Sequence, residues 1–560
     1  MNLYGLGLSA LNAAQNNLTT TGHNISNADV EGYNRQTVLM QTRGAKATGA
    51  GYIGRGVQAV TVQRAYDSFL HNQLVQAQSK GAALVTYGNE ISQLNDLFAD
   101  RTVGISPAIQ KFFDSVNAVA STPADPAARQ EMIGRADSLA TQLNEANRFI
   151  DNQRSDINTQ LDTTVSQINS YIERIDDMNQ QITKARASGT GNHAPNDLLD
   201  QREQLVSELN QLVDVKVLEQ DGNFSITLGS GQILLGGPTI YPLESRPSND
   251  DPSRNVINTT SGFNNGKPVL NEVSDSSFRG GTLGGLLQYR SDTLDQAQNS
   301  LGRLAASIAI EFNQVQTKGF DLKGNPGQPF FSVSFNDPVA SSTNSGNETI
   351  KINETATVDV NELTGLDYEI KYENDSYYVR TLPNGKFPTD PLQSGDKVGG
   401  FTLEFPTSPK PIDGDTWSFR PTRSSADSFK VEISDPAMIA AAGEDPDNPG
   451  TSLGTANGDN ALKLAQLQNQ KTMGNGSMNF NDAYSQMVNR VAVNSQQNST
   501  AAKAQVNLIQ QNYAAQQAVS GVDLNEEYLN LERYTDQFRA ASRMIDVASS
   551  LFDTILGLRA

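Results

Sequence analysis

Side chains that could support chemistry are few in this sequence of 560 residues. It contains no cysteine, which excludes disulfides, thiolate metal sites and cysteine nucleophiles. Its three histidines are His23, His71 and His193, and none has a second ligand at a metal-binding spacing. A zinc centre or a catalytic triad would have to be assembled from isolated residues. The sequence therefore predicts no metal site, and His71 is interpreted as a structural residue of a helix.

A glycine pattern near the N-terminus suggests cofactor chemistry, but its context argues against it. Gly49, Gly51 and Gly54 match the G-x-G-x-x-G spacing of a dinucleotide-binding loop. Such a loop follows a buried strand and precedes a helix, whereas residues 43–48 are polar and residues 57–62 have a strand-like pattern. No acidic residue lies about 20 positions further on to bind a ribose. We therefore expect a hairpin or flexible loop, and no cofactor.

Paired carboxylates are the remaining source of possible catalysis. Asp176 and Asp177 are adjacent, as are Glu526 and Glu527, and both pairs lie in helix-like sequence. Neighbouring residues of a helix point in different directions, so neither pair can share a proton. We interpret both pairs as surface charges. Because motifs for nucleoside triphosphates, zinc peptidases and serine hydrolases are also missing, the sequence predicts no catalytic residue and no enzyme.

The net charge restricts the partners. The sequence holds 42 Lys and Arg against 62 Asp and Glu, a net charge of −20. Such a surface repels phosphate backbones and anionic membranes, so we expect no nucleic-acid partner. No uninterrupted apolar run approaches the roughly 20 residues that span a bilayer, which predicts no membrane insertion. Residues 1–11 lack the basic region of a signal peptide, so an extracellular location would require a leaderless route.

Both ends of the chain have heptad spacing. Near the N-terminus the large residues are Tyr4, Leu11, Leu18 and Ile25, with Gly7, Ala14 and Thr21 between them. Near the C-terminus the same interval gives Leu524, Leu531, Phe538, Ile545 and Phe552, with a second row of Tyr534, Ala541, Ala548 and Ile555. Each pattern predicts a helix with a narrow apolar stripe that needs a partner. We favour stripes that pack between subunits, either mainly or in addition to pairing with each other, and an ordinary intramolecular helical hairpin is the alternative.

The region between these ends is predicted to be mainly α-helical with an inserted β domain. Apolar residues from Leu139 to Ile182 keep a three-to-four spacing, which indicates one long helix ended by Gly189 and Gly191. Further helices are predicted at 72–98, 107–120, 196–213, 284–317 and 480–515, forming a bundle along the long helix. Because residues 480–515 return to this bundle, the middle of the chain is interpreted as an insertion.

Strand patterns occur in two places. Residues 215–228 predict a hairpin with its turn at Asp221-Gly222-Asn223. From about 336 to 423 the pattern alternates between polar and apolar residues, with turn signals between short runs. The predicted domains are residues 1–70 with 506–560, a terminal helical domain; 71–335 with 431–505, a long-helix bundle with the small hairpin; and 336–430, an outer β lobe.

The N-terminal segment is similar to a known protein family. Residues 11–36, LNAAQNNLTTTGHNISNADVEGYNRQ, resemble the signature of flagellar rod, hook and hook-associated proteins. In physical terms, Asn24, Ile25, Ser26 and Asn27 suit the end of a helix, and Gly32 suits a turn that releases Tyr33 onto a neighbouring surface. Residues 29–31, Asp-Val-Glu, replace the small or Thr residues that are usual before the Gly-Tyr pair.

Further motifs make the resemblance more specific. They resemble the hook-associated protein 1, or FlgK-type, family and lie at residues 125–130, 195–202, 283–287, 318–320, 330–331, 480–484, 519–528 and 548–556. Together with the N-terminal signature they cover the chain except for the β lobe and the proline-rich loops. The β lobe matches only a generic strand pattern.

The resemblance implies a structural, non-enzymatic subunit of the bacterial flagellum, in a ring that joins hook to filament. Its implied partners are further copies of itself, the hook protein, the third hook-associated protein, and a cytoplasmic export chaperone at the C-terminal helix. It implies flagellar type III export and an extracellular position after a transient cytoplasmic stage. The expected subunit-interface residues come from two patterns. The heptad stripes contribute Tyr4, Leu11, Leu18, Leu524, Leu531, Tyr534, Phe538, Ile545 and Phe552. The N-terminal signature contributes Asn24, Ile25, Asn27, Gly32 and Tyr33.

Two alternatives remain. Another axial subunit, from the hook or the rod, would share the N-terminal signature but should lack the long helix and the motifs spread over the whole chain. A secreted glycan hydrolase would have to use carboxylates of the β lobe, but these acidic residues lie mostly at turns, where solvation explains them.

Overall fold

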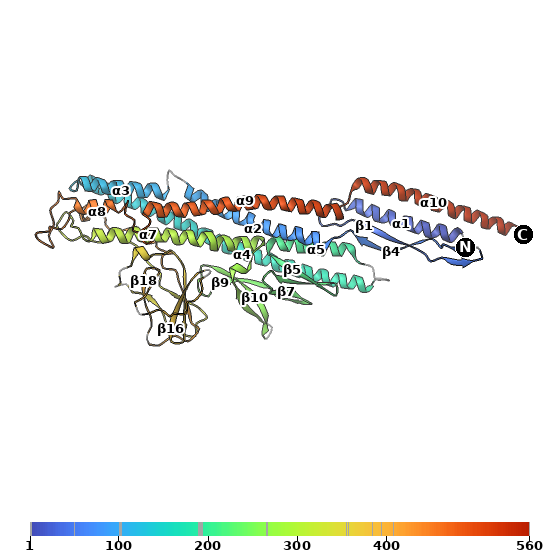
Figure 1. The fold of residues 1–560 in the computed structure, drawn as a ribbon, viewed down its shortest axis with the longest axis horizontal. Coiled ribbons are helices and arrows are strands. Elements are labelled where there is room, and N and C mark those ends of the chain that lie inside the picture. Colours follow the sequence, from blue (N-terminus) through green and yellow to red (C-terminus); the bar gives the residue numbers. More distant parts are fainter. Residues whose placement is uncertain are drawn as a thin grey trace.

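The computed structural model describes residues 3–558, apart from 50, 100–103, 189–193, 265–266, 354–355, 357, 383–384, 394 and 407. His193, Gly189 and Gly191 fall outside the described residues. About half of the described residues are helical, in agreement with the mainly α-helical fold class expected from the sequence. Figure 1 shows an elongated molecule with both chain termini at one end and a group of strands along one side.

The end that carries the termini is built from two helices and a β hairpin. Helix α1 (Leu3–Ser26) packs along α10 (Leu524–Gly557). Strand β1 (Gln36–Thr42) pairs with β4 (Val57–Arg64), and β2 (Lys46–Thr48) pairs with β3 (Gly51–Ile53) beyond them. The glycine-rich segment therefore lies at the end of a hairpin, which confirms the expectation of a hairpin loop.

The body consists of the helices between these ends. They are α2 (Ser68–Ala99), α3 (Ile105–Ser121), α4 (Pro126–Ser188), α5 (Asn196–Leu212), α6 (Gly281–Tyr289), α7 (Asp295–Gln316), α8 (Asp459–Gln466) and α9 (Phe480–Ser520), with a π-helical turn, η2 (Arg290–Leu294), between α6 and α7. The predicted long helix is confirmed as α4, in which the periodic residues from Leu139 to Ile182 are buried. Their three-to-four spacing places them on one face, and α3, α5, α6 and α7 pack along α4.

Two sheets lie against the body. The predicted hairpin is confirmed as β5 (Val215–Gln220) and β6 (Asn223–Leu228), with positive φ at Asp221 and Gly222 in its turn. It continues into β7 (Ile233–Gly236) and β8 (Thr239–Ile240). A second sheet, in the order β11-β10-β9, contains β9 (Leu243–Pro247), β10 (Asn255–Asn264) and β11 (Lys267–Val273). These last five strands were not predicted from the sequence.

Residues 333–429, called the β lobe below, lie between two paired strands. These are β12 (Phe331–Ser332) and β20 (Lys430–Val431), so the segment leaves and re-enters the body at one place. One sheet has the order β13 (Val339–Ala340), β19 (Thr416–Phe419), β15 (Tyr368–Glu373), β16 (Ser376–Thr381), and the other β14 (Lys351–Ile352), β18 (Phe401–Glu404), β17 (Lys397–Val398). Trp417, Phe419 and Phe401 are almost completely buried between them.

Buried ion pairs attach the β lobe to the body. Asp295, at the start of α7, lies 2.7 Å from Arg154 of α4 and 3.8 Å from Arg423 of the lobe. Burial alone would raise the pKa of Asp295, but the surrounding arginines outweigh burial and hold that pKa far below its usual range. The network is completed by Asp251, Arg254, Asp275, Arg290, Asp367 and Arg420.

Two chemical properties of the described residues bear on function. Within the described ranges, the helices lack an apolar stretch long enough to cross a bilayer. The same residues contain no group of three or more His, Cys, Asp or Glu side chains placed to hold a metal ion.

Candidate functional site

The contact between α1 and α10 buries the small residues of the two heptad patterns. Gly7, Ala14 and Thr21 of α1 are buried, as are Ala541 and Ala548 of α10. The helices approach closely at Gly7, where an added Cβ would lie 2.9 Å from Cγ1 of Ile545. The two stripes therefore pair within one chain, because the rows of small residues let the two helices approach closely.

The large heptad residues lie at the edges of this contact. Leu11, Leu18, Ile25, Tyr534, Phe538 and Ile545 are partly buried. Tyr4, Leu524, Leu531, Phe552 and Ile555 are exposed, from 36% for Leu531 to 63% for Ile555. Pairing within the chain therefore leaves an apolar surface on both helices.

Asn24 connects the end of α1 to the first strand. Its amide Nδ2 donates to the carbonyl oxygen of Gln36 at 2.9 Å, and its Oδ1 accepts from the backbone N–H of Gln36 at 2.9 Å and from the Tyr33 hydroxyl at 2.7 Å. Asn24 and Ile25 lie in the last turn of α1, which ends at Ser26, so the predicted helix end at residues 24–27 is confirmed. Asn27 follows the helix, and its side chain donates to the backbone oxygen of His23 at 2.9 Å.

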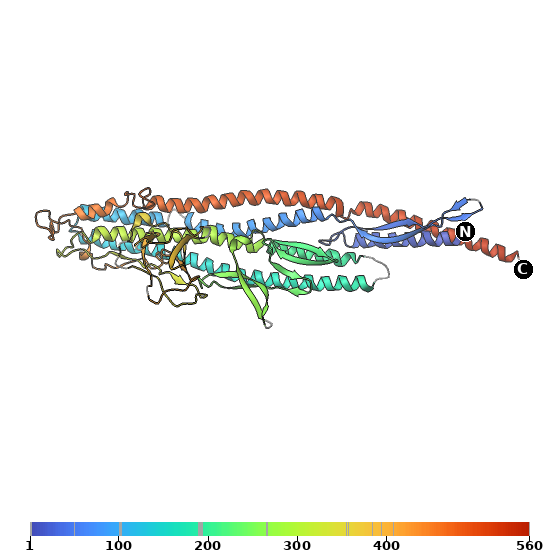
Figure 2. The same ribbon diagram turned by 60° about the horizontal axis from the view of Figure 1, so that its bottom comes forward.

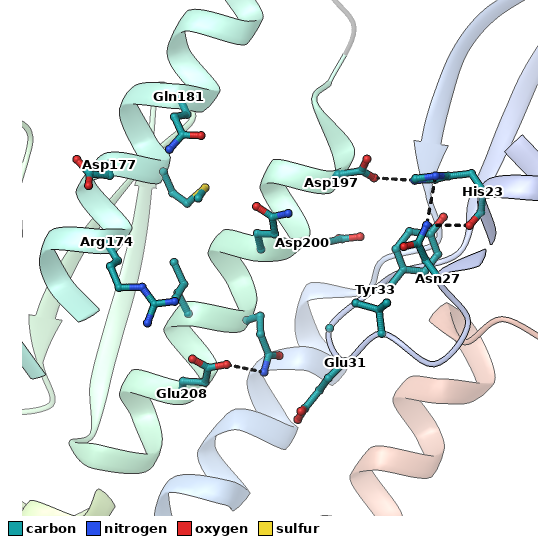
Figure 3. A pocket seen from close by; sticks show the side chains of 16 residues that line it. His23, Asn27, Glu31, Tyr33, Arg174, Asp177, Gln181, Asp197, Asp200 and Glu208 are labelled. Atoms are coloured by element: carbon teal, nitrogen blue, oxygen red, sulfur yellow. Dashed lines mark hydrogen bonds and ion pairs between the residues drawn. The ribbon is translucent and has the colours of Figure 1, made fainter. Parts of the chain in front are cut away.

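Gly32 and Tyr33 place the turn after α1 against α5. Gly32 has a φ of +80°, and a Cβ at this position would lie 2.9 Å from Oε1 of Gln204. Both constraints favour glycine. The Tyr33 ring is half-buried and meets the ring of His23 edge-on at 5.6 Å between centroids. In this chain, the surface that Tyr33 contacts is therefore the chain's own, as Figure 3 shows.

The N-terminal part of α5 binds the segment after Tyr33. Asp200 accepts from the backbone N–H of Asn34 at 3.0 Å and from its amide at 2.7 Å. Asp197 accepts from the Gln36 amide at 2.7 Å and lies 3.2 Å from Nε2 of His23. These acids belong to the segment 195–202, which sequence reasoning identified as a motif without assigning it a role. In the structure, this segment fixes the start of β1 to the body.

Arg64, at the end of β4, completes this contact from the other strand. Its guanidinium lies 2.5 Å from Asp200 and 3.1 Å from Glu203, and all three side chains are largely buried. Burial raises the pKa of Asp200 and of Glu203, and the charge of Arg64 opposes that rise in both. A buried cation between two buried carboxylates holds the hairpin at a defined place on α5.

Arg35 makes the equivalent connection to α10. Its Nε donates to Glu527 at 2.7 Å, its terminal nitrogens donate to Glu526 at 2.7 and 3.1 Å, and its backbone N–H donates to the carbonyl of Ser520 at 2.9 Å. The Glu527 side chain is only 2% exposed, whereas that of Glu526 is 56% exposed. The expectation that both are surface charges is therefore wrong for Glu527. Adjacent helical residues point in different directions, and only Glu527 points toward Arg35.

These contacts form what we call the joint: residues 24–36 and Arg64, the first turns of α5, and Glu526 and Glu527 of α10. Sequence reasoning found Asn24, Asn27, Gly32 and Tyr33. It missed the partners on α5 and α10, although the quoted motifs at 195–202 and 519–528 contain most of them.

A cleft of about 460 Å³ opens beside the joint, between the turn after α1, the end of α4, and α5. Figure 3 shows Glu31, Asp177, Asp197 and Glu208 around it, with Arg174 as the cation on α4. The pKa of the Tyr33 hydroxyl is raised by burial and by the charges of Asp197 and Asp200. The cleft therefore has a negative potential and suits a cationic group.

Comparison with known proteins identifies the family. Residues 91–331 match the model described as the flagellar hook-associated protein FlgK helical domain, and residues 6–34 match that of the flagella basal body rod protein. The chain is 36% identical over 555 residues to flagellar hook-associated protein 1 of Salmonella typhimurium, with 99% of each chain covered. It is 35% identical to the protein of that name from Escherichia coli K12, covering 99% of this chain and 98% of the relative.

A solved structure agrees with this assignment. The structure described as the flagellar hook junction protein FlgK from Burkholderia pseudomallei superposes with a TM-score of 0.71 at 30% identity. The match covers 80% of this chain and all of the other. The chain therefore belongs to the flagellar hook-associated protein 1 family and is a structural subunit of the bacterial flagellum.

Proposed function

We propose that this protein forms the junction between hook and filament as a ring of identical subunits joined through their terminal helices. The observation that carries the proposal is the exposed apolar surface of the α1–α10 pair. Leu531 remains 36% exposed although α10 packs along α1, and Phe552 and Ile555, nearer the end of α10 than Ile545 opposite Gly7, are 57% and 63% exposed. Large exposed apolar side chains in one stripe are typical of a surface that another protein covers. Neighbouring subunits with the same stripe are the simplest partner.

The joint supports the transmission of force through this assembly. Arg35 and Arg64 tie the hairpin to α10 and α5 through short, largely buried ion pairs. Pairs of this kind have restricted geometry, because breaking one strands a buried charge. On this proposal the terminal helices pack into the wall of the junction, and the joint passes torque from them to the body.

We further propose the partners at either side. The hook protein would contact one face of the ring and the third hook-associated protein the other, outside the cell. Before export, a cytoplasmic chaperone would cover the end of α10, since its apolar residues there are 53–83% exposed: Leu551, Phe552, Ile555, Leu556 and Leu558. The proposed domains are 1–70 with 506–560 for assembly, 71–335 with 431–505 as a rigid bundle, and 336–430 as an outer lobe.

Deleting the gene tests the proposed position. Electron microscopy of the deletion strain, with an assay of flagellin in the medium, should show bare hooks and flagellin that has been shed. Cells without hooks would place the protein in the rod or the hook. Normal filaments would refute a role in the axial structure.

A double substitution tests the proposed seam. Leu531→Asp with Phe538→Asp should abolish incorporation into flagella, because two charges would be placed in an apolar contact. The body should remain folded, as measured by circular dichroism of the purified protein. Leu218→Asp is the control, since Leu218 is 65% exposed on β5, a strand beside the body that lies away from α10 in Figure 1. A normal filament from the double variant would rule out the seam.

A further inference from the structure

The β hairpin beside α1 has an unusual charge distribution. Between Glu31 and Asp67 the sequence contains five Lys and Arg residues and no Asp or Glu, in a chain with a net charge of −20. Arg35 and Arg64 are neutralised at the joint. The other three, Arg43, Lys46 and Arg55, form no ion pair with any described residue. We call residues 36–64 the arm.

The arm also exposes apolar side chains. Tyr52 is 82% exposed and Ile53 is 43% exposed, both on β3 near its end. Leu39 and Val60, on the paired strands β1 and β4, are 49% and 38% exposed. A two-stranded sheet packed on α1 by one face leaves its other face open. A surface that is both basic and apolar is suited to a partner surface that is acidic and partly apolar.

The cleft at the joint has these properties, but the arm cannot reach the cleft of its own chain. Gly56 lies against Ser9 so closely that a Cβ there would be 2.1 Å from the serine Oγ. From His23, which lines the cleft, to Ser9 is about 21 Å along α1 at 1.5 Å per residue, and β2 and β3 extend further still. Figure 2 shows the arm beside α1, pointing away from the body.

We propose that the arm of one subunit docks in the acidic cleft of a neighbouring copy, an inference that rests on the proposed side-by-side assembly. Lys46 and Arg55 then face Asp177 and Glu208, and Tyr52 packs against the apolar part of the cleft, where Met178 and Leu205 lie. Arm and cleft are different surfaces at different places, so the contact is heterologous. Such contacts repeat around a ring or along a helix, as an axial structure requires.

Photo-crosslinking in flagellated cells tests the contact. A photoreactive amino acid replaces Tyr52 in the full-length chain, flagella are purified after irradiation, and mass spectrometry identifies the crosslinked peptides. We expect a crosslink between two copies, from position 52 to the segment 174–208. The same probe in place of Leu218, which is exposed on β5, serves as the control and should not give this product.

Charge reversal tests the chemistry of the contact. Lys46→Glu with Arg55→Glu should reduce the crosslink yield at least tenfold, and adding Asp177→Lys with Glu208→Lys in the same chain should restore it. Lys216→Glu, on β5, should leave the yield unchanged. Three results in cells that still assemble filaments would overturn the arm–cleft contact alone. They are a crosslink to a different protein, a crosslink to another surface of a second copy, and the absence of any crosslink. A chain absent from purified flagella would instead contradict the proposed function.

Discussion

Replacing Arg35 with leucine should lower the local unfolding free energy of the first turns of α10 by more than the loss of one exposed ion pair would. Arg35 binds two adjacent carboxylates, of which Glu527 is 2% exposed and Glu526 is 56% exposed. Loss of the partner of a buried carboxylate costs about 3–5 kcal/mol, whereas a solvent-exposed pair contributes about 0–1 kcal/mol. We therefore expect Arg35→Leu to lower the local unfolding free energy by about 3 kcal/mol, nearly all of it through Glu527.

Hydrogen–deuterium exchange of the full-length monomer measures this effect. Amides in residues 524–531 should exchange roughly a hundredfold faster in Arg35→Leu, which is what about 3 kcal/mol corresponds to when exchange follows local opening. Glu526→Gln is the matched control and should change exchange by less than about fivefold, or 1 kcal/mol. Arg35→Leu combined with Glu527→Gln should recover much of the lost protection, because no buried charge is then stranded.

Equal effects of Glu526→Gln and Glu527→Gln would refute the reasoning, since they would mean that burial does not distinguish the two carboxylates. So would an Arg35→Leu variant with wild-type exchange. A third informative result is loss of protection throughout the body, which would show that the joint stabilises the whole fold and not only the attachment of α10.

Three other substitutions test separate features of the same region. Asn24→Ala should destabilise the monomer by about 2 kcal/mol in urea unfolding, because it leaves buried hydrogen-bond donors without acceptors; a change below about 0.5 kcal/mol would contradict this role. Gly7→Val should cost about 1–3 kcal/mol in thermal unfolding, because its Cβ would crowd Ile545, whereas Gly5→Val, with nothing within 4 Å, should not. Burial, assisted by the nearby charge of Arg64, lowers the pKa of His71 to about 4. The unfolded chain takes up that proton near pH 6.5, so His71 lowers stability progressively as the pH falls from 6.5 to 4, by up to about 3 kcal/mol. His71→Gln should flatten this part of the pH–stability curve, and an unchanged curve would refute the assignment.

Regular patterns explain the parts of the fold that could be predicted. The residues from Leu139 to Ile182 keep one spacing over more than 40 positions, so a single long helix was the clear interpretation. The hairpin at 215–228 has a turn, Asp221-Gly222, that suits positive φ at both positions. By contrast, β10 contains Asn, Thr, Ser and Gly in place of a regular alternation, and its neighbours are set by pairing rather than by local preference.

Only the part of the joint that lies in one local sequence pattern could be predicted. Asn24, Gly32 and Tyr33 lie in one local signature, which indicated a helix end and a turn. Their partners on α5 come more than 160 positions later in the chain, and no local pattern shows that Asp200 accepts from Asn34. Nor does the Glu526-Glu527 pair reveal which carboxylate is covered, since that depends on where Arg35 lies in the folded chain.

The attachment of the β lobe has a consequence for how this chain can be altered. The lobe enters and leaves at the paired strands β12 and β20, so excising it requires only a short turn between Ser332 and Lys430. Of the charged residues in the network around Asp295, three belong to the lobe: Asp367, Arg420 and Arg423. Those that stay behind are three arginines and three aspartates: Arg154, Arg254, Arg290, Asp251, Asp275 and Asp295. The remaining charges balance, so excising the lobe leaves no net charge stranded in the helical bundle. The cost of excision then lies in the apolar contacts of Ala426 and Phe429, which belong to the same buried core as the bundle.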